Sequence, residues 1–224
     1  MQSSFEPTCG FTLATESSAI SLRHDDGGNW TGGHIGVGAL IGSKYGVSAP
    51  ELSDYLSRLA TAADMAAVTV VVATAIFGAN TWNRLAADHL PVGVDFMTAD
   101  HGYNRGAASS ALVLQRLVGA DADGWIGQQT VAAIASFEVT RVDVSRLDPR
   151  ALQEAVGATQ DGVIGAKTIG ALTALPVDQA LLACLYGAQV RDYRGLAAAP
   201  DNPGWFSRAR ARWIAARSLS APVS

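Results

Sequence analysis

Aromatic and charged residues are scarce in this sequence, at 7% and 16% of its 224 residues. The formal net charge is -4, so the chain offers no general cationic surface for the phosphates of nucleic acid. Apolar residues nevertheless make up 49%, with abundant alanine, which favours a folded, mainly helical protein over a disordered one. We therefore predict an all-α fold and no nucleic-acid partner.

Cysteine is also rare, since only 2 occur, Cys9 and Cys184, and neither belongs to a C-x-x-C motif. Two cysteines are too few for a disulfide framework, so we expect free thiols. Gly36, Gly38 and Gly42 lack the spacing of a phosphate-binding loop and a preceding strand. The histidines lack the His-Glu-x-x-His spacing of a metal site; they are His24, His34, His89 and His101. We expect no metal, nucleotide or other cofactor.

Long hydrophobic runs are absent as well. The longest apolar stretch, residues 66–77, is interrupted by threonines and falls short of the roughly 18 residues needed to cross a bilayer. The first residues contain no basic region followed by an apolar run, the pattern of a secretory signal peptide. We therefore expect no stable membrane insertion, and synthesis in the cytoplasm without a signal peptide.

Hydrophobic periodicity predicts helices separated by one long loop. Glycines from Gly27 to Gly42 forbid regular helix in that loop, Pro91 ends a helix, and Gly119 caps another in the left-handed conformation. The predicted helices cover residues 5–16, a stretch from Pro50 towards Leu90, residues 95–118, a segment from Asp178 through Val190, and a final segment containing Trp205 and Trp213.

A repeat with an offset of 38 residues spans positions 114–168. Its first copy is Leu114-Gln115, Gly119, Asp123-Gly124, Ile126-Gly127 and Thr130, and its second is Leu152-Gln153, Gly157, Asp161-Gly162, Ile164-Gly165 and Thr168. Each copy predicts a helix end, a glycine cap, an Asp-Gly turn, a buried isoleucine and a second helix whose early threonine bonds free amides. By itself the repeat specifies architecture and not activity.

The length allows two modest domains. Arginines gather near the C-terminal end, either as a basic face for an anionic polymer or as a solvated helix face. They are Arg191, Arg194, Arg208, Arg210, Arg212 and Arg217.

A glutamate and two aspartates lie near the start of the long loop. Glu16 ends the first predicted helix, and Asp25 and Asp26 follow in the polar loop. Cleavage of a glycosidic bond needs one carboxylic acid to protonate the leaving oxygen and a second carboxylate to activate water or stabilise positive charge. The spacing permits this chemistry, but most such pairs are solvated surface groups.

The loop itself carries a more specific pattern. It contains Asp26-Gly27-Gly28-Asn29-Trp30-Thr31-Gly32-Gly33 and then Gly42-Ser43-Lys44-Tyr45-Gly46-Val47-Ser48. This pattern resembles the glycoside hydrolase family 108 muramidases of bacteria and phages, which carry Glu-Gly-Gly, Asp-Pro-Gly-Asn-Trp-Thr-Gly-Gly and Gly-Thr-Lys-Tyr-Gly-Ile-Ser. The resemblance extends through Leu90-Pro91-Val92-Gly93-Val94-Asp95 and Asp123-Gly124-Trp125-Ile126-Gly127, over nearly the whole chain.

The resemblance implies roles for residues of this loop. It places the catalytic acid on Glu16, the loop aspartate on Asp26 and the hydroxyl of the family's Thr-Lys-Tyr-Gly motif on Ser43, which would orient a water. Because the alignment is ambiguous by one residue, Asp25 is an alternative to Asp26. Trp30, Tyr45, Asp100 and Asn104 are expected either to bind substrate or to support the core and loop.

This sequence departs from the family pattern at two places. Ser17-Ser18 stand where the family has Gly-Gly, and Gly27 stands where it has proline. Serines would displace Glu16 if the family's glycines occupy backbone angles that serine disfavours.

The resemblance also implies a domain order: a lysozyme-like catalytic domain with a glycine-rich active-site loop in residues 1–138 and a small helical peptidoglycan-binding domain in residues 139–224. The second would hold the enzyme on its insoluble substrate. Trp205 would bind sugar or seal the helices there.

The implied activity is hydrolysis of the bond between N-acetylmuramic acid and N-acetylglucosamine in peptidoglycan, by an endolysin or a wall-remodelling enzyme. We expect a monomer acting in the periplasm or cell wall, delivered by a holin or a secretion apparatus. The alternatives are a non-catalytic wall-binding or secretion-accessory protein, and a chitinase-like enzyme on a related amino-sugar polymer.

Overall fold

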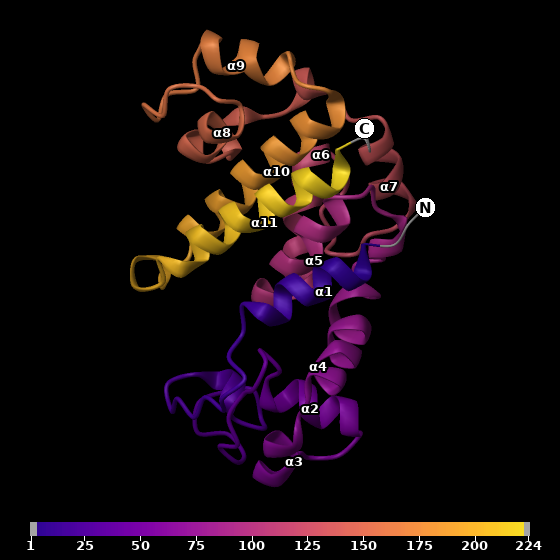
Figure 1. The fold of residues 1–224 in the computed structure, drawn as a ribbon, viewed down its shortest axis with the longest axis vertical. Helices are drawn as coiled ribbons and strands as arrows, with labels where there is room; N and C mark the ends of the chain where they lie inside the picture. The colour runs from indigo at the N-terminus through magenta and orange to yellow at the C-terminus, as the bar shows by residue number, and fades with distance from the viewer. Residues whose placement is uncertain (1–3, 222–224) are drawn as a thin grey trace. The chain divides into compact units, whose positions relative to one another are not determined.

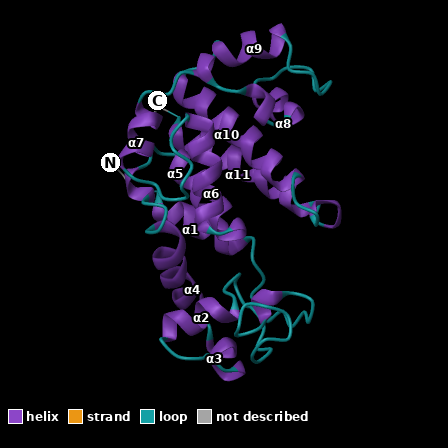
Figure 2. Cartoon of the chain, turned by 180° about the vertical axis from the view of Figure 1, so that it is seen from behind, coloured by secondary structure: helices purple, strands orange, loops and turns teal. Residues whose placement is uncertain are grey.

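The computed structural model describes residues 4–221, and these residues are all-helical apart from loops and isolated β-bridges (Figure 2). They form two compact units. We call residues 5–83 the N-terminal unit, and Ser4 with residues 84–221 the C-terminal unit. No helix in the described part of the chain is long and apolar enough to cross a membrane.

The N-terminal unit combines short helices with a long loop (Figure 1). Its elements are α1 (Phe5–Ala14), the 3-10 turn η1 (Gly27–Asn29), α2 (Ala49–Leu56), α3 (Ala62–Ala67), α4 (Val70–Phe77) and the π-helical turn η2 (Gly78–Trp82). Phe5 packs on Phe77 and Trp82, with ring centroids 5.8 and 5.4 Å apart. This aromatic cluster joins the first helix to α4 and η2 and fixes the position from which the loop departs.

The prediction of a single helix from Pro50 towards Leu90 is wrong, because the segment is broken into separate helices. Ser48, Thr61 and Thr69 each accept a hydrogen bond from a backbone N–H of the first turn of α2, α3 and α4. Such N-caps start a new helix wherever they occur. Ser57 ends α2 in the left-handed conformation at φ 53°.

The C-terminal unit is built around one helix. Its helices are α5 (Val94–Arg105), α6 (Ala107–Val118), α7 (Gln128–Ala135), α8 (Pro149–Ala155), α9 (Ala166–Thr173), α10 (Val177–Arg194) and α11 (Gly204–Ser220), with 3-10 turns η3 (Ala87–His89), η4 (Val139–Arg141), η5 (Val144–Arg146) and η6 (Ala199–Asp201). Helix α10 contacts α5, α6, α8, α9 and α11, and α11 lies alongside it (Figure 1). Residues 180–187 of α10 are all buried, as expected for a helix covered on every side.

The helix expected over residues 95–118 is interrupted, because Gly106 at φ 82° separates α5 from α6. Gly119 ends α6 in the left-handed conformation at φ 73°, as predicted. The final helix contains Trp205 and Trp213, also as predicted. The functional boundary expected between residues 138 and 139 falls inside the C-terminal unit, before η4, and stays a prediction about function.

The repeat forms two loops with the same hydrogen bonds. Gln115 donates to Asp123 Oδ1 at 2.8 Å, and its Oε1 accepts from the Gly124 N–H at 2.9 Å. Thirty-eight residues later, Gln153 donates to Asp161 Oδ1 at 2.6 Å, and its Oε1 accepts from the Gly162 N–H at 2.9 Å. The buried glutamine is therefore the residue that closes each Asp-Gly turn.

The repeat's threonine has a different role from the one expected. Thr130 Oγ1 accepts a hydrogen bond from Gln115 Nε2 at 3.2 Å, which ties it to the same turn. The predicted isoleucine of the first copy, Ile126, is buried at 8% exposure, while its counterpart Ile164 is only partly buried.

Candidate active site

Glu16 lies two residues beyond the end of α1, in a bend, and is partly buried. The helix ends because Thr15 and Glu16 donate only 3-10 type hydrogen bonds, to the carbonyls of Thr12 and Leu13. The helix thus ends two residues earlier than predicted, and Glu16 stands where the loop begins instead of in the last helical turn.

Three loop segments meet next to this bend. Ser21 and Ser43 form an isolated antiparallel bridge, with N···O distances of 2.9 and 3.0 Å. On the other side, the carbonyl of Asn29 accepts hydrogen bonds from the N–H groups of Ile41 and Gly42, at 3.0 and 3.1 Å. The segment that carries Ser43 is thus held between the segment that follows Glu16 and the segment that follows Asp26.

Tyr45 lies in a tight turn directly after Ser43. Lys44 and Val47 pair across the turn, and Tyr45 and Gly46 both have positive φ, at 53° and 76°. This is the geometry of a two-residue hairpin with a type I′ turn. A tyrosine rarely adopts such a conformation, and residues held this way cluster at functional sites.

The two loop aspartates have different partners. Asp25 is exposed and forms a two-pronged ion pair with Arg23, at 2.9 and 3.1 Å, whose hydrogen bond lowers the pKa of the aspartate. Asp26 is also exposed, and its Oδ1 accepts the N–H of Gly28 at 2.9 Å as the N-cap of η1. Asp26 thus has a carboxylate oxygen that its cap does not use, whereas Arg23 engages both oxygens of Asp25.

Trp30 supports the loop through its polar edge. Its indole N–H donates to the carbonyl of His24 at 3.1 Å, and its ring lies edge to face with that of His24, at 6.2 Å between centroids. The ring remains partly exposed. Both roles expected for Trp30, sugar stacking and loop support, are compatible with this position.

The departures from the family pattern cause no backbone strain at the serines. Ser17 and Ser18 are not among the residues with positive φ in the described part of the chain. Whether Glu16 is displaced relative to the family's acid stays a prediction. At Gly27, an added Cβ would lie 2.9 Å from the carbonyl oxygen of Gly33, so this loop closes more tightly than one carrying a side chain there.

Asp100 and Asn104, the other expected substrate-binding residues, lie on α5 in the C-terminal unit. Asp100 is fully buried, and its two carboxylate oxygens receive Arg208 Nη2 at 2.7 Å and Arg212 Nε at 2.6 Å. Burial alone would raise the pKa of Asp100, but the two guanidinium groups outweigh it and hold the pKa at about 2. Asn104 donates to the carbonyl of Asp100 at 3.2 Å. These positions favour core support.

The late arginines do not form one basic face. Arg212 is 0% exposed, and Arg208 shares its partner Asp100. Arg194 pairs with Asp148 at 2.5 Å, and Arg210 pairs with Glu154. The arginines mainly neutralise acids within the C-terminal unit, which the sequence pattern did not reveal because these partners lie far apart in the chain.

Trp205 and Trp213 lie against tyrosines of α10. Trp205 stacks on Tyr193 with ring centroids 5.5 Å apart, and Trp213 stacks on Tyr186 at 5.2 Å. Trp213 is buried and Trp205 partly so. For Trp205 this contact favours the sealing role over sugar binding.

Asn29 has a role that the sequence did not assign to it. Its side chain is fully buried and donates from Nδ2 to the carbonyl of Arg23 at 2.9 Å, while its own carbonyl holds the segment before Ser43. Through its amide N–H group and its backbone carbonyl, Asn29 ties the segment of Arg23 to the segment before Ser43. In the sequence, Asn29 stands between two glycines and a tryptophan. An amide side chain at such a position is the signal of a loop with a fixed conformation, because a flexible loop does not require one.

No group of three or more His, Cys, Asp and Glu side chains within residues 4–221 is placed to hold a metal ion. Cys9 and Cys184 are both buried free thiols.

Comparison with known families found a match in the N-terminal part of the chain. A family model described as Glycosyl hydrolase 108 matches residues 9–106, somewhat less than half of the chain. The match includes Glu16, Asp26 and Ser43 and stops before the repeat, so the wider resemblance expected over the rest of the chain stays a prediction. A search of the curated proteins found no match.

Comparison with solved structures covers the whole chain. The fold is similar to the protein described as "Structure of Brucella abortus SagA", with a TM-score of 0.57 and 24% sequence identity. The similarity covers 98% of this chain and 97% of that chain. It establishes a shared fold that extends through both units.

Proposed function

We propose that this protein is a glycoside hydrolase of the family 108 type, which cleaves the bond between N-acetylmuramic acid and N-acetylglucosamine in peptidoglycan. The observation that carries the proposal is the meeting of three loop segments beside Glu16, within the stretch that matches the family model. Acting on peptidoglycan, the enzyme would work in the periplasm or cell wall.

In the proposed mechanism Glu16 is the general acid that protonates the leaving oxygen. Asp26 is the second carboxylate, since one of its oxygens is not used by the cap of η1. Ser43 supplies a hydroxyl that orients water, and its backbone is fixed from both sides by Ser21 and by Asn29 through Gly42. Tyr45 and Trp30 are the proposed sugar-contacting rings.

The first experiment measures the release of reducing ends from purified Gram-negative peptidoglycan. We expect Glu16→Gln to lower turnover by a factor of about a hundred or more, the usual contribution of a general acid. Glu6→Gln is the matched control, because Glu6 is an exposed glutamate in the first turn of the adjoining α1. Equal turnover in the wild type and Glu16→Gln would refute the assignment of the acid.

Further variants test the partners of Glu16. Asp26→Asn keeps an oxygen to cap η1 but removes the charge, so a loss of turnover without a loss of stability would support a catalytic charge. Asp25→Asn should change turnover little, because Arg23 already neutralises Asp25. Ser43→Ala should lower turnover because it removes the hydroxyl group. Ser43→Thr should keep turnover at the level of the wild type, since threonine is the residue of the family motif.

The second candidate function is a non-catalytic wall-binding or secretion-accessory protein. It is favoured if the wild type and Glu16→Gln both bind peptidoglycan in a pull-down and neither releases reducing ends. A comparison of chitin with peptidoglycan as substrate tests the chitinase-like alternative. Cell fractionation tests the proposed delivery by a holin or a secretion apparatus. Sedimentation tests whether the protein is a monomer.

A further inference from the structure

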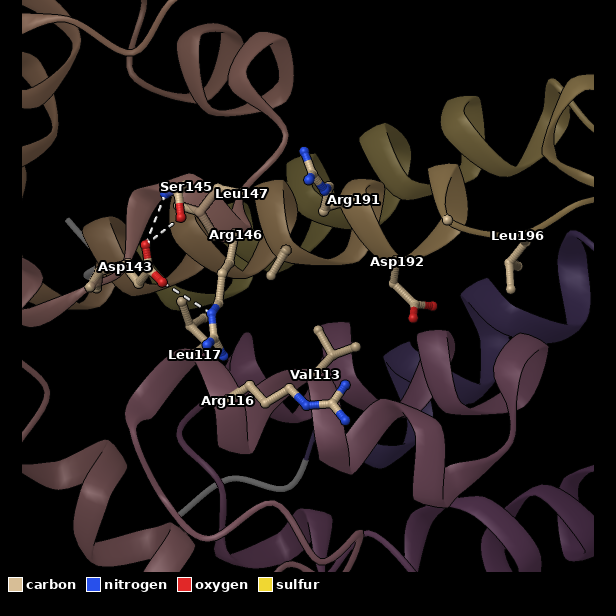
Figure 3. A pocket seen from close by; sticks show the side chains of 13 residues that line it. Val113, Arg116, Leu117, Asp143, Ser145, Arg146, Leu147, Arg191, Asp192 and Leu196 are labelled. Carbon is tan, nitrogen blue, oxygen red and sulfur yellow. Dashed lines mark hydrogen bonds and ion pairs between the residues drawn. The ribbon is translucent and has the colours of Figure 1, made fainter.

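A cavity of about 540 Å³ opens in the C-terminal unit, well away in sequence from the loop that carries Glu16. It is bordered by α6, by α10 and by the segment around η5. Its volume lies within the range of cavities that bind small molecules, roughly 300 to 1,000 Å³. Figure 3 shows side chains from α6 and α10 facing one another across it.

Part of the lining of this cavity is apolar. Val113 and Leu117 come from α6, Leu147 follows η5, and Leu196 follows α10. Val113 and Leu147 are buried, at 8% and 2% exposure, so Leu117 and Leu196, which are partly exposed, present most of the apolar surface. These side chains offer contacts for methyl and methylene groups of a ligand and none of the flat aromatic surface on which sugar rings stack.

Charged groups also line the cavity, and the arginines outnumber the acids. Arg116, Arg146 and Arg191 line the cavity together with Asp143 and Asp192. Asp143 is held by Arg146 at 3.0 Å, and Asp192 by Arg105 at 2.8 Å from outside the lining. Both acids are therefore already neutralised.

Two arginines of the lining remain available. Neither Arg116 nor Arg191 makes an ion pair with any residue in the described range 4–221. The whole chain carries a formal net charge of -4, so this surplus of cations is local. In Figure 3 the Arg116 side chain extends beneath Val113, which places a guanidinium beside the apolar lining.

We propose that this cavity binds a short carboxylate-bearing peptide with small apolar side chains, which is the chemistry of the peptide stems of peptidoglycan. The inference rests on the proposed function for its choice of polymer. A guanidinium recognises a carboxylate through paired N–H groups, and the apolar lining suits alanine methyl groups. A neutral glycan would leave the arginines without a partner.

Recognition of the peptide would complement recognition of the glycan. Two sites on one chain that engage the two components of the same polymer raise the effective concentration of the enzyme on it. The cavity would then select glycan strands that still carry peptides over strands from which the peptides have been removed.

The test is calorimetric titration of the full chain with the stem tripeptide L-alanyl-γ-D-glutamyl-meso-diaminopimelate, and in parallel with the disaccharide of N-acetylglucosamine. We expect saturable tripeptide binding that weakens about tenfold in Arg116→Gln, the loss of one charge-assisted hydrogen-bonding group. Arg84→Gln is the matched control, because Arg84 is an exposed arginine of the same unit outside the lining. Ala188→Leu fills the cavity without altering charge and should abolish binding.

The outcomes separate this inference from the proposed function. Equal tripeptide affinity in the wild type, Arg116→Gln and Ala188→Leu would overturn the cavity assignment, as would disaccharide binding that Ala188→Leu removes. If the wild type releases reducing ends but does not bind the tripeptide, the cavity proposal fails alone. If it binds the tripeptide but never cleaves peptidoglycan, the proposed function fails alone.

Discussion

The backbone N–H of Tyr45 donates a hydrogen bond to the carbonyl oxygen of Ser17, with an N···O distance of 2.8 Å. This bond joins the turn after Ser43 to the residue that directly follows Glu16. Two parts of the proposed machinery, almost thirty positions apart in the chain, are thereby joined, in addition to the two bonds between Ser21 and Ser43. The turn must keep its left-handed geometry for the bond to form, which makes its residues informative targets.

Tyr45→Gly should raise the KM for peptidoglycan without lowering the free energy of unfolding. Glycine adopts positive φ freely, so the substitution relieves strain of about 1 kcal/mol while removing the ring. We expect the free energy of unfolding to stay within about 1 kcal/mol of the wild type and the KM for peptidoglycan to rise. Ser57→Gly, which relieves the same φ of 53° at the end of α2, should change neither kinetic constant. An unchanged KM in Tyr45→Gly removes the proposed sugar contact.

Gly42→Ala should disturb the segment that carries Ser43. An added Cβ would lie 2.5 Å from the carbonyl oxygen of Ser21, at a residue with φ 85°. We expect a loss of more than about 1 kcal/mol in the free energy of unfolding and a marked fall in turnover. Gly10→Ala is the opposite case, because nothing lies within 4 Å of its Cβ in α1 and alanine favours helix. Gly10→Ala should be stabilising, and denaturant unfolding of both variants checks the contrast.

Local patterns explain which parts of this fold the sequence predicted. Gly119 and the Asp-Gly turns are determined by backbone preferences of a few neighbouring residues, so the repeat could be recognised without any tertiary information. The breaks at Thr61 and Thr69 are equally local. The apolar periodicity of the sequence continues across both positions and predicts one helix, whereas the capping preference of the threonines breaks it.

Long-range partners explain what the sequence did not predict. Arg212 and Asp100 are 112 positions apart, and neither residue type signals burial. The sequence places Arg212 on a basic or solvated helix face and leaves Asp100 between substrate binding and core support, and only their pairing permits both to be buried. For the candidate site, the glycine-rich motif and its family resemblance identified the loop, whereas the bonds that join its three segments required the fold.

Gln115→Glu and Gln153→Glu should be equally destabilising, because each glutamine closes an equivalent turn. Glutamate can still accept the glycine N–H, but it cannot donate to Asp123 or Asp161 and adds a like charge beside it. We expect a loss of about 1 to 3 kcal/mol for each variant at neutral pH. Chemical unfolding measures both, and the exposed Trp125 reports on the first turn by fluorescence. A large effect at one position and none at the other contradicts the equivalence.

Because of the buried His101, the free energy of unfolding should fall as the pH falls from about 7 to 5. Its ring is fully buried, and burial lowers its pKa from 6.5 to about 4. Ser110 donates its hydroxyl hydrogen to the carbonyl of Thr98 at 2.7 Å, so its oxygen accepts from His101 Nδ1 at 3.2 Å. His101 Nε2 lies 3.4 Å from Asp192 Oδ2, whose charge favours the protonated ring but does not outweigh burial in setting the pKa.

The sign of the pH effect follows from the two pKa values. The unfolded histidine takes up a proton near pH 6.5, whereas the folded one does so only near pH 4, so the unfolded state binds more protons between these values. Stability is fully present above about pH 6.5 and is lost as the pH falls towards 4, by about 2 kcal/mol between pH 7 and 5. Asp100 and Asp192, whose pKa values lie at about 2, add a further loss only below pH 4.

Denaturant unfolding at pH 7 and pH 5 measures this difference, and His101→Gln should reduce it because glutamine does not titrate. His34→Gln is the control, since His34 is exposed and should leave the pH dependence intact. If the wild type and His101→Gln lose the same free energy over this interval, another group titrates there, and the neutral buried histidine is not its source. A reduced loss in His101→Gln alone would assign the pH dependence to the burial of this one ring.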